Sequence, residues 1–258
     1  IVFLTINSII GTGIFLSPGG VSKQAGSFAP FIYICAAIFA AVLAVTFAAA
    51  SKYVVRNGAA YSYTKAAFGD NAGLFIGVTR FVSSGIAWGV MATGVVKNVL
   101  SILGLNDKDS IQITIGFLVL MLILLFINLK GTAFLTIISN LSTIGKMAAL
   151  GITIIAGLII IVTTGQNHMH EIDALTDASG KAFISKMNST IFVTAVISAF
   201  YAFTGFESVA SGASDMENPE KNLPRAIPLA IGVIAAIYFG IVLVAMMINP
   251  VALVQSEE

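Results

Sequence analysis

The amino-acid sequence predicts an all-α, polytopic membrane protein, and three observations support that fold class. The 258 residues are 57% hydrophobic and only 10% charged, with a mean hydropathy of +0.98, whereas soluble domains carry about a quarter charged residues. Several stretches without Asp, Glu, Lys or Arg are long enough to cross roughly 30 Å of hydrocarbon as helices. These stretches are continuously apolar, which excludes barrel strands, because barrel strands alternate apolar and polar residues.

Seven transmembrane segments are predicted along the chain, joined by short polar connections. They cover Ile1–Val21, Phe28–Ser51, Ala72–Leu103, Ile111–Leu129, Ala133–Thr164, Ser189–Ser214 and Arg225–Asn249. Arg80 and Lys97 lie toward the ends of the third segment, where their charges can reach the membrane surface. The longest connection, residues 165–188, is expected to be an extracellular loop. Its His168 and His170 have no convergent partners in the sequence, so a solvated loop is favoured over a metal site.

The basic residues of the connections predict the orientation, because Lys and Arg are enriched on the cytoplasmic side. Six fall on one side of the predicted topology and four on the other. The first group is Lys52, Arg56, Lys65, Lys130, Lys221 and Arg225, and the second is Lys23, Lys108, Lys181 and Lys186. We therefore expect a multi-pass protein of the plasma membrane whose N-terminus lies in the cytoplasm.

The first and sixth segments are each broken near mid-membrane by glycine-centred sequence. The breaks are Gly11-Thr12-Gly13 and residues 204–208, which begin with Thr204-Gly205. Freed backbone at that depth is tolerated only where it lines a cavity or packs against protein. Corresponding breaks five helices apart indicate an inverted-repeat transporter. We expect residues 1–164 to form a first five-helix repeat and residues 189–258 to begin a second, incomplete one, so that the chain is a fragment.

The first break exposes the N-terminus of a half-helix, whose partial positive charge suits a carboxylate. A nucleotide site is excluded, because the dinucleotide motif would need glycine at Leu16. The alternative is a close helix crossing, for which small residues are common. The second break favours the ligand interpretation. Aromatic residues surround that second break, where they either gate a pocket or pack: Phe200, Tyr201, Phe203 and Phe206.

Two charged residues lie at bilayer depth, Glu207 beside the second break and Lys146 in the fifth segment. A carboxylate there costs about 2.5 kcal/mol or more, which indicates a functional role. Lys146 shares a small, polar helical face with Ser142 and Thr153, which is typical of a bundle interior. Snorkelling to the surface is the alternative, but Lys146 is about 20 Å along its helix from Ala133. We expect Lys146 to carry coupling or proton exchange and Glu207 to act as a local modulator.

Three motifs in order resemble those of amino acid permeases of the amino acid–polyamine–organocation superfamily. They are Ile9–Phe15, Asn57–Tyr63 and Phe200–Ser208, the last running on to Glu217–Arg225. The resemblance covers essentially the whole chain. It implies a fold of usually twelve helices built on two inverted five-helix repeats, of which seven helices are visible here.

The resemblance also implies a site. The substrate carboxylate is expected at the amides of Gly11, Thr12 and Gly13. The substrate ammonium is expected at carbonyls near Ile9 and in the second break, with candidate residues Tyr201, Ala202, Phe203 and Thr204. Lys146 stands where sodium-coupled relatives bind an ion, which implies sodium-independent transport coupled to protons or to exchange.

The expected function is therefore secondary transport of amino acids across the plasma membrane by alternating access. The alternatives are a polyamine or organic-cation antiporter of the same superfamily, a solute channel and a nutrient receptor. The expected partners are an amino acid, the lipid bilayer and co-transported protons, without nucleic acid, cofactor or metal. No metalloprotease motif, nucleophile elbow or phosphate loop occurs in the sequence, so an enzyme is not expected.

Overall fold

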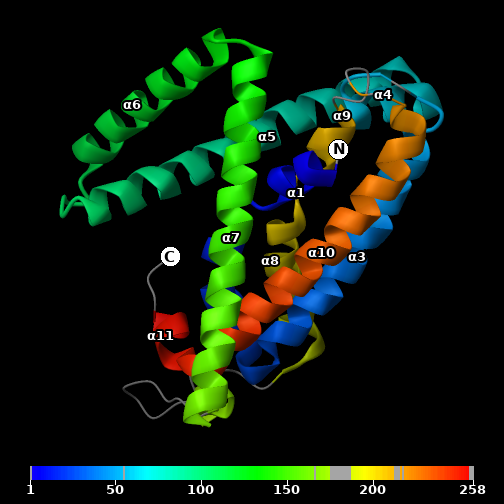
Figure 1. Cartoon of the computed structure of the whole chain (residues 1–258). Coiled ribbons are helices and arrows are strands. Elements are labelled where there is room, and N and C mark those ends of the chain that lie inside the picture. The colour runs from blue at the N-terminus through cyan, green and yellow to red at the C-terminus, as the bar shows by residue number, and fades with distance from the viewer. Residues whose placement is uncertain are drawn as a thin grey trace. The chain divides into compact units, whose positions relative to one another are not determined.

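The computed structural model describes residues 2–54, 56–165, 167–174, 187–211, 216 and 218–255. Over these ranges every regular element is a helix (Figure 1). The chain divides into two compact units, Ile1–Ala59 with Ser142–Glu258, and Ala60–Leu141. Lys181, Lys186 and Glu217, which entered the topology and motif arguments, lie outside the described residues.

Five helical stretches are long and apolar enough to cross a membrane, which confirms the predicted fold class. They are Gly13–Ala50, Asp70–Ile102, Ser110–Leu129, Phe134–Thr164 and Pro219–Ile248. The first stretch joins two of the predicted segments through a short 3-10 turn. The sixth predicted segment is the shorter apolar stretch Ser189–Phe203, whose continuation follows a break in the helix.

The first unit contains both breaks and most of the elements. They are α1 (Val2–Ile9), α2 (Gly13–Ala25), η1 (Gly26–Phe28), α3 (Ala29–Ala50), η2 (Met169–Ala174), α8 (Ser189–Phe200), η3 (Tyr201–Phe203), α9 (Phe206–Ser211), α10 (Pro219–Ile248) and α11 (Pro250–Gln255). The part of α7 (Thr132–Thr164) that follows residue 141 also belongs to this unit.

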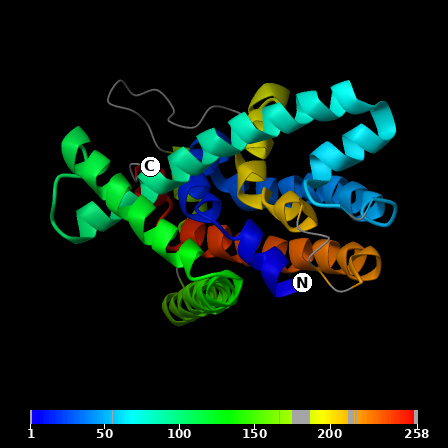
Figure 2. The same cartoon turned by 90° about the horizontal axis from the view of Figure 1, so that it is seen from above.

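The core of the first unit is the long contact between α3 and α10, which lie side by side in Figures 1 and 2. Alanines at intervals of four along α3 are buried and let α10 approach closely: Ala36, Ala40, Ala44 and Ala48. Two tyrosines, Tyr33 of α3 and Tyr238 of α10, are fully buried in this core with their rings edge to face. Buried tyrosines need hydrogen-bond partners. Tyr238 finds its partners at the breaks.

The second unit contains a helical corner that was not predicted from the sequence as a separate helix. Here α4 (Ala59–Phe68) folds against the first turns of α5 (Asp70–Ile102), and α6 (Ser110–Leu129) packs on α5. A Cβ at Gly73 would lie 2.7 Å from the Lys65 Cβ, so glycine allows the corner to close. At about 15 Å, α4 is too short to cross a bilayer.

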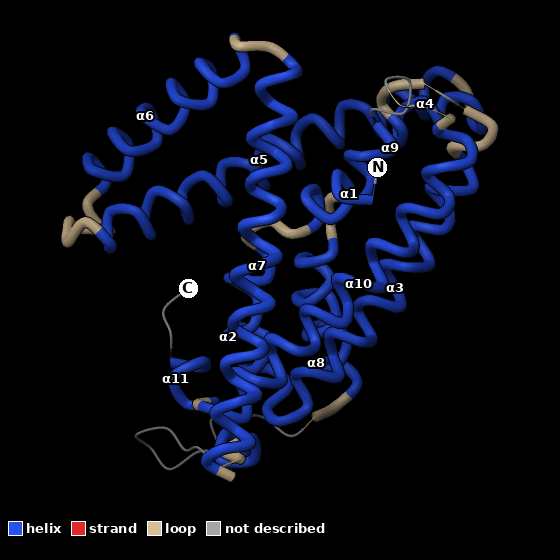
Figure 3. The backbone as a smooth tube through the Cα atoms, viewed as in Figure 1, coloured by secondary structure: helices blue, strands red, loops and turns tan. Residues whose placement is uncertain are grey.

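Each of the two breaks is a glycine-containing turn between helices. Figure 3 shows both as loop segments inside helical stretches. In the first unit α1 ends at Ile9 and α2 begins at Gly13. The second break comprises η3 with Thr204 and Gly205, so α9 begins at Phe206. Glu207 therefore lies in the first turn of α9, whereas the prediction placed it inside a break reaching residue 208.

Candidate functional site

The first break leaves backbone donors at the N-terminus of α2. The Gly11 amide donates to the Ile9 carbonyl oxygen at 2.8 Å, so this predicted carboxylate ligand is engaged within the turn. The first amides of a helix have no partner inside it. Within the described part of the chain, no hydrogen-bond partner is found for the amides of Thr12, Gly13 and Ile14. The Thr12 hydroxyl oxygen is buried and likewise has no partner there.

The second break is organised by its own side chains. The Thr204 hydroxyl donates to the Tyr201 carbonyl oxygen at 2.8 Å, so this predicted acceptor is already in use. The Gly205 amide donates to the Glu207 carboxylate at 2.9 Å. A carboxylate in the first turn of a helix satisfies a free amide and favours the helix dipole. Glu207 therefore holds the start of α9, which explains a charge at this depth.

The two breaks lie against each other, and two glycines permit the contact. A Cβ at Gly13 would lie 2.6 Å from the Ala202 Cα, closer than real Cβ atoms approach. A Cβ at Gly205 would overlap the Ser8 carbonyl oxygen, and the Gly205 φ of 119° also disfavours a side chain. The amino end of α2 thus contacts η3, and the carboxyl end of α1 contacts the Gly205 turn.

Lys146 reaches from α7 to the first break. Its Nζ donates to the Ile10 carbonyl oxygen at 2.5 Å and to the Asn7 carbonyl oxygen at 3.2 Å. The last carbonyls of a helix have no partner inside it, and the C-terminal end of the dipole is negative. The half-buried Lys146 ammonium donates to two of these α1 carbonyls and places its positive charge at the negative end of the α1 dipole. Lys146 therefore contacts the end of α1 within the first unit, and its coupling role stays a prediction.

Tyr238 of α10 completes the site, and it was not predicted from the sequence. Its hydroxyl lies 3.1 Å from the Ala202 carbonyl oxygen and 3.5 Å from the Ile9 carbonyl oxygen, one from each break. The ring is fully buried and packs on Phe203, with centroids 5.1 Å apart. A lone tyrosine in the middle of an apolar span was the available signal, because a hydroxyl there must find an acceptor.

The arrangement offers opposite hydrogen-bonding ends to a small zwitterion. Amide donors at α2 suit a carboxylate, and carbonyl acceptors at Ile9 and Ala202 suit an ammonium. The only described charges at the breaks are Lys146 and Glu207, and each already has backbone partners. Over the described ranges no three His, Cys, Asp or Glu side chains gather as metal ligands.

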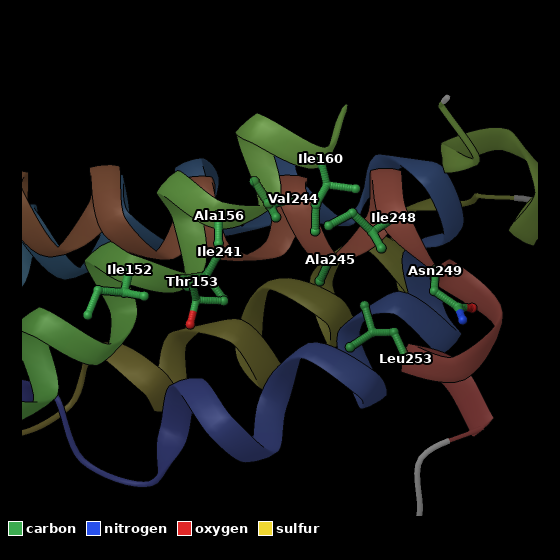
Figure 4. A pocket seen from close by; sticks show the side chains of 11 residues that line it. Ile152, Thr153, Ala156, Ile160, Ile241, Val244, Ala245, Ile248, Asn249 and Leu253 are labelled. Atoms are coloured by element: carbon green, nitrogen blue, oxygen red, sulfur yellow. The ribbon is translucent and has the colours of Figure 1, made fainter. Parts of the chain in front are cut away.

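A large pocket between α7, α10 and α11 differs in character from the breaks (Figure 4). Its volume is about 570 Å³, and aliphatic residues such as Ile152, Ile160 and Val244 line it. Its two polar side chains already have backbone partners: the Thr153 hydroxyl donates to Ala149, and the Asn249 amide oxygen accepts from Ala252. This pocket suits apolar groups rather than a charged head group.

Spans of bilayer length with two facing breaks define a multi-pass membrane protein. The chain belongs to the amino acid permease family, which matches it over residues 1–258, and the predicted family is thereby confirmed.

Known relatives agree with this assignment. An uncharacterized transporter of Mycobacterium tuberculosis is 43% identical over 100% of this chain and 56% of its own length. The serine/threonine exchanger SteT of Bacillus subtilis is 28% identical over 92% of this chain and 51% of its own. The branched-chain amino acid permease BcaP of Lactococcus lactis is 27% identical over 96% and 54%. The chain spans about half the length of the curated relatives it matches, and these relatives are transporters rather than enzymes.

Proposed function

We propose that the protein is a secondary transporter that moves amino acids across the plasma membrane by alternating access. The single observation that carries the proposal is the contact of the two breaks, which brings amide donors and carbonyl acceptors together in one place. The family and the relatives with amino acid substrates in their names support the same proposal. In this proposal residues 1–164 form the first five-helix repeat and residues 189–258 begin the second, and each opens with a broken helix.

In this proposal the substrate binds through its head group. The carboxylate takes the amides of Thr12 and Gly13, and Gly11 joins them when its amide leaves the Ile9 carbonyl. The ammonium takes carbonyls at Ile9, Tyr201, Ala202 and Thr204, sharing those that already accept a hydrogen bond. Phe203 lines the site through its contact with Tyr238. Because only the shared head group is read, this backbone site does not choose among side chains.

Lys146 is proposed as the coupling residue. Its ammonium holds the end of α1, where a bound cation would otherwise be needed. Transport is then sodium-independent, and it is coupled to protons or to exchange through the charge on Lys146. Glu207, which holds α9 in place, modulates the site locally.

Uptake into proteoliposomes tests the transport proposal. The protein in its full native length is reconstituted, and labelled serine, threonine, leucine and a polyamine compete for uptake. We expect saturable uptake of neutral amino acids that internal substrate accelerates and that a sodium gradient leaves unchanged. Uptake of the polyamine alone supports the organic-cation antiporter, an ohmic current supports a channel, and binding without uptake supports a receptor.

Lys146→Ala tests the coupling role in the same assay. We expect driven uptake to be lost by at least about tenfold while the protein still reaches the membrane, because the α1 carbonyls lose their cation. Lys146→Arg keeps the charge with another shape and is the matched control for charge. If Lys146→Ala transports at the original rate with the original pH dependence, the coupling role is wrong.

A further inference from the structure

A second groove, with an entirely apolar lining, runs along the contact between α3 and α10. Its volume is about 390 Å³, and Ile38, Ala41 and Phe239 are among the residues that line it. Ile38 is 60% exposed, so the groove is open along its side. A Cβ at Gly232, which also lines it, would meet nothing within 4 Å. The groove therefore has room for a further apolar group.

The length of the groove matches the thickness of one leaflet of a bilayer. Its residues on α10 run from Pro228 to Phe239, which is about 16 Å of helix at 1.5 Å per residue. Half of a hydrocarbon core of roughly 30 Å is about 15 Å. Both helices belong to stretches that are long and apolar enough to cross a membrane. An acyl chain of one leaflet thus fits the groove in length and in polarity.

At one end of the groove, the end of α3 lies beside the start of α10. The two helices are antiparallel, because the Phe31 ring, near the start of α3, lies 6.1 Å from the Phe239 ring, in the C-terminal half of α10. Figure 1 shows the opposite end, where the last turn of α3 meets the first turns of α10. Three exposed cations lie there, and none has an ion pair with another described residue: Lys52, Lys221 and Arg225.

These cations lie on the helix faces that line the groove. Residues three, seven or eleven apart share one face of a helix. Arg225 precedes Pro228 by three residues, and Lys221 precedes it by seven. Lys52 follows Ala41 by eleven, in a turn whose hydrogen bonds continue those of α3. The apolar groove therefore leads into a cluster of three positive charges.

The nearby acidic residue Glu220 does not cancel this cluster. It is adjacent to Lys221 in the first turn of α10, and adjacent residues of a helix do not share a face. It is also less exposed than the three cations. Positive charge therefore dominates the described residues at this end of the groove.

We propose that the groove binds an anionic diacyl phospholipid, with one acyl chain between α3 and α10 and the phosphate at Lys52, Lys221 and Arg225. Lys and Arg near the membrane surface attract anionic lipids, and both donate charge-assisted hydrogen bonds to phosphate. A free phosphate has no chain for the groove, so a lipid is the ligand that uses both ends. No residue that lines the groove belongs to a break, and the proposal does not depend on transport.

Native mass spectrometry of the protein in its full native length, in detergent, tests the headgroup end. Phosphatidylglycerol and phosphatidylcholine with identical acyl chains are titrated separately, and the apparent Kd of the first bound lipid is measured. We expect phosphatidylglycerol to bind at least about tenfold more tightly. Arg225→Gln should weaken its binding about fivefold, and Lys52→Gln with Arg225→Gln about twenty-five-fold, because each cation contributes about fivefold. Lys130→Gln, the same charge change in the second unit, is the matched control and should change neither Kd.

Gly232→Leu tests the groove end. The new side chain takes open space instead of overlapping protein atoms, and leucine favours a helix more than glycine does, so the fold should be retained. We expect phosphatidylglycerol to bind at least about tenfold more weakly, because two or more methylene groups of the chain lose their place. Gly151→Leu, on α7 with equally open space, is the matched control and should leave the Kd unchanged.

Several results would overturn the proposal. Equal affinity for the two phospholipids, or unchanged affinity after Lys52 and Arg225 are replaced, contradicts recognition of an anionic headgroup. Unchanged affinity of Gly232→Leu contradicts a chain in the groove, and displacement of the lipid by inorganic phosphate would indicate a site for a free anion. Should Gly232→Leu fail to fold, a phosphatidylglycerol with chains too short to fill the groove tests the same point on the native protein. It should bind more weakly than the long-chain lipid, and equal binding would contradict the proposal.

Discussion

At the scale of single residues, the Tyr238 hydroxyl lies between the two breaks. One hydroxyl proton is placed near two carbonyl oxygens, at 3.1 Å and 3.5 Å, and it can satisfy only one at a time. The shorter contact, to Ala202, is the better hydrogen bond. The Ile9 carbonyl keeps the Gly11 amide as its stronger partner. A small movement of α10 relative to either break would transfer the hydrogen bond from one acceptor to the other.

Tyr238→Phe is expected to destabilise the protein by about 1 kcal/mol and to weaken amino acid binding, because a buried carbonyl loses its donor. The apparent melting temperature in detergent and equilibrium binding of a labelled amino acid measure the two effects. Tyr53→Phe, at a residue 86% exposed, is the matched control and should change neither. Unchanged values in both measurements for Tyr238→Phe would mean that its hydroxyl is dispensable.

Gly205→Ala is expected to prevent assembly of the breaks, because the new methyl group would overlap the Ser8 carbonyl oxygen. Gly131→Ala is the matched control: Gly131 also has a positive φ, of 89°, but nothing lies within 4 Å of the place that its new methyl group would take. The control should cost about 1–2 kcal/mol from backbone strain alone. Size-exclusion profiles of both variants measure the difference, and equal profiles would show that the overlap is relieved at no cost.

At the scale of elements, a broken helix has two ends to satisfy. The carboxyl end of α1 receives Lys146 from α7, and the amino end of α9 receives Glu207 from its own first turn. Each charge therefore lies at the end of the helix dipole that favours it. From the sequence, both charges were expected to cost free energy at bilayer depth. In the structure both lie where hydrogen bonds with freed backbone groups offset that cost.

The α4–α5 corner carries a prediction on charge. The ammonium of Lys65 lies 3.2 Å from Asp70, and that hydrogen bond and negative charge raise the pKa of Lys65 above its usual value. Lys65 therefore stays charged at neutral pH, and the pair is lost only as pH rises beyond the ordinary range of lysine. Asp70→Asn should speed acylation of Lys65 at pH 9.5, measured by peptide mass spectrometry. Asp109→Asn, the same charge change in the same unit, should leave that rate unchanged.

The sequence predicted the elements better than the contacts between them. Spans and breaks follow from composition and glycine, which act locally, so they were predicted within a few residues. Tyr238 acts on a carbonyl 229 residues away, and no local pattern encodes that contact. The sequence also does not encode that the Gly11 amide donates to the Ile9 carbonyl within its own turn. A freed amide takes whichever acceptor the local geometry offers. The α4 helix escaped prediction because its sequence is typical of a polar connection.

At the scale of the whole molecule, the predicted orientation assigns each connection to one side of the membrane. If the N-terminus lies in the cytoplasm, as the basic residues predict, the connections at Lys108 and at residues 165–188 are expected outside and those at Lys52 and Lys130 inside. In a Cys35→Ala background, single cysteines at these positions are labelled in intact cells with an impermeant maleimide. Lys108→Cys should react before lysis, whereas Lys52→Cys and Lys130→Cys should react only after it. The reverse pattern would invert the topology.

The contact of the breaks has a consequence for how the protein is made. The carbonyls at the end of α1 accept from Lys146, the Ile9 carbonyl also lies 3.5 Å from the Tyr238 hydroxyl, and the end of α1 packs on Gly205. At about 5–20 residues per second, roughly ten to fifty seconds separate synthesis of α1 from that of Tyr238. During that time the first segment carries polar backbone without its permanent partners. The insertion machinery must therefore keep this segment hydrated or sheltered until the later helices arrive.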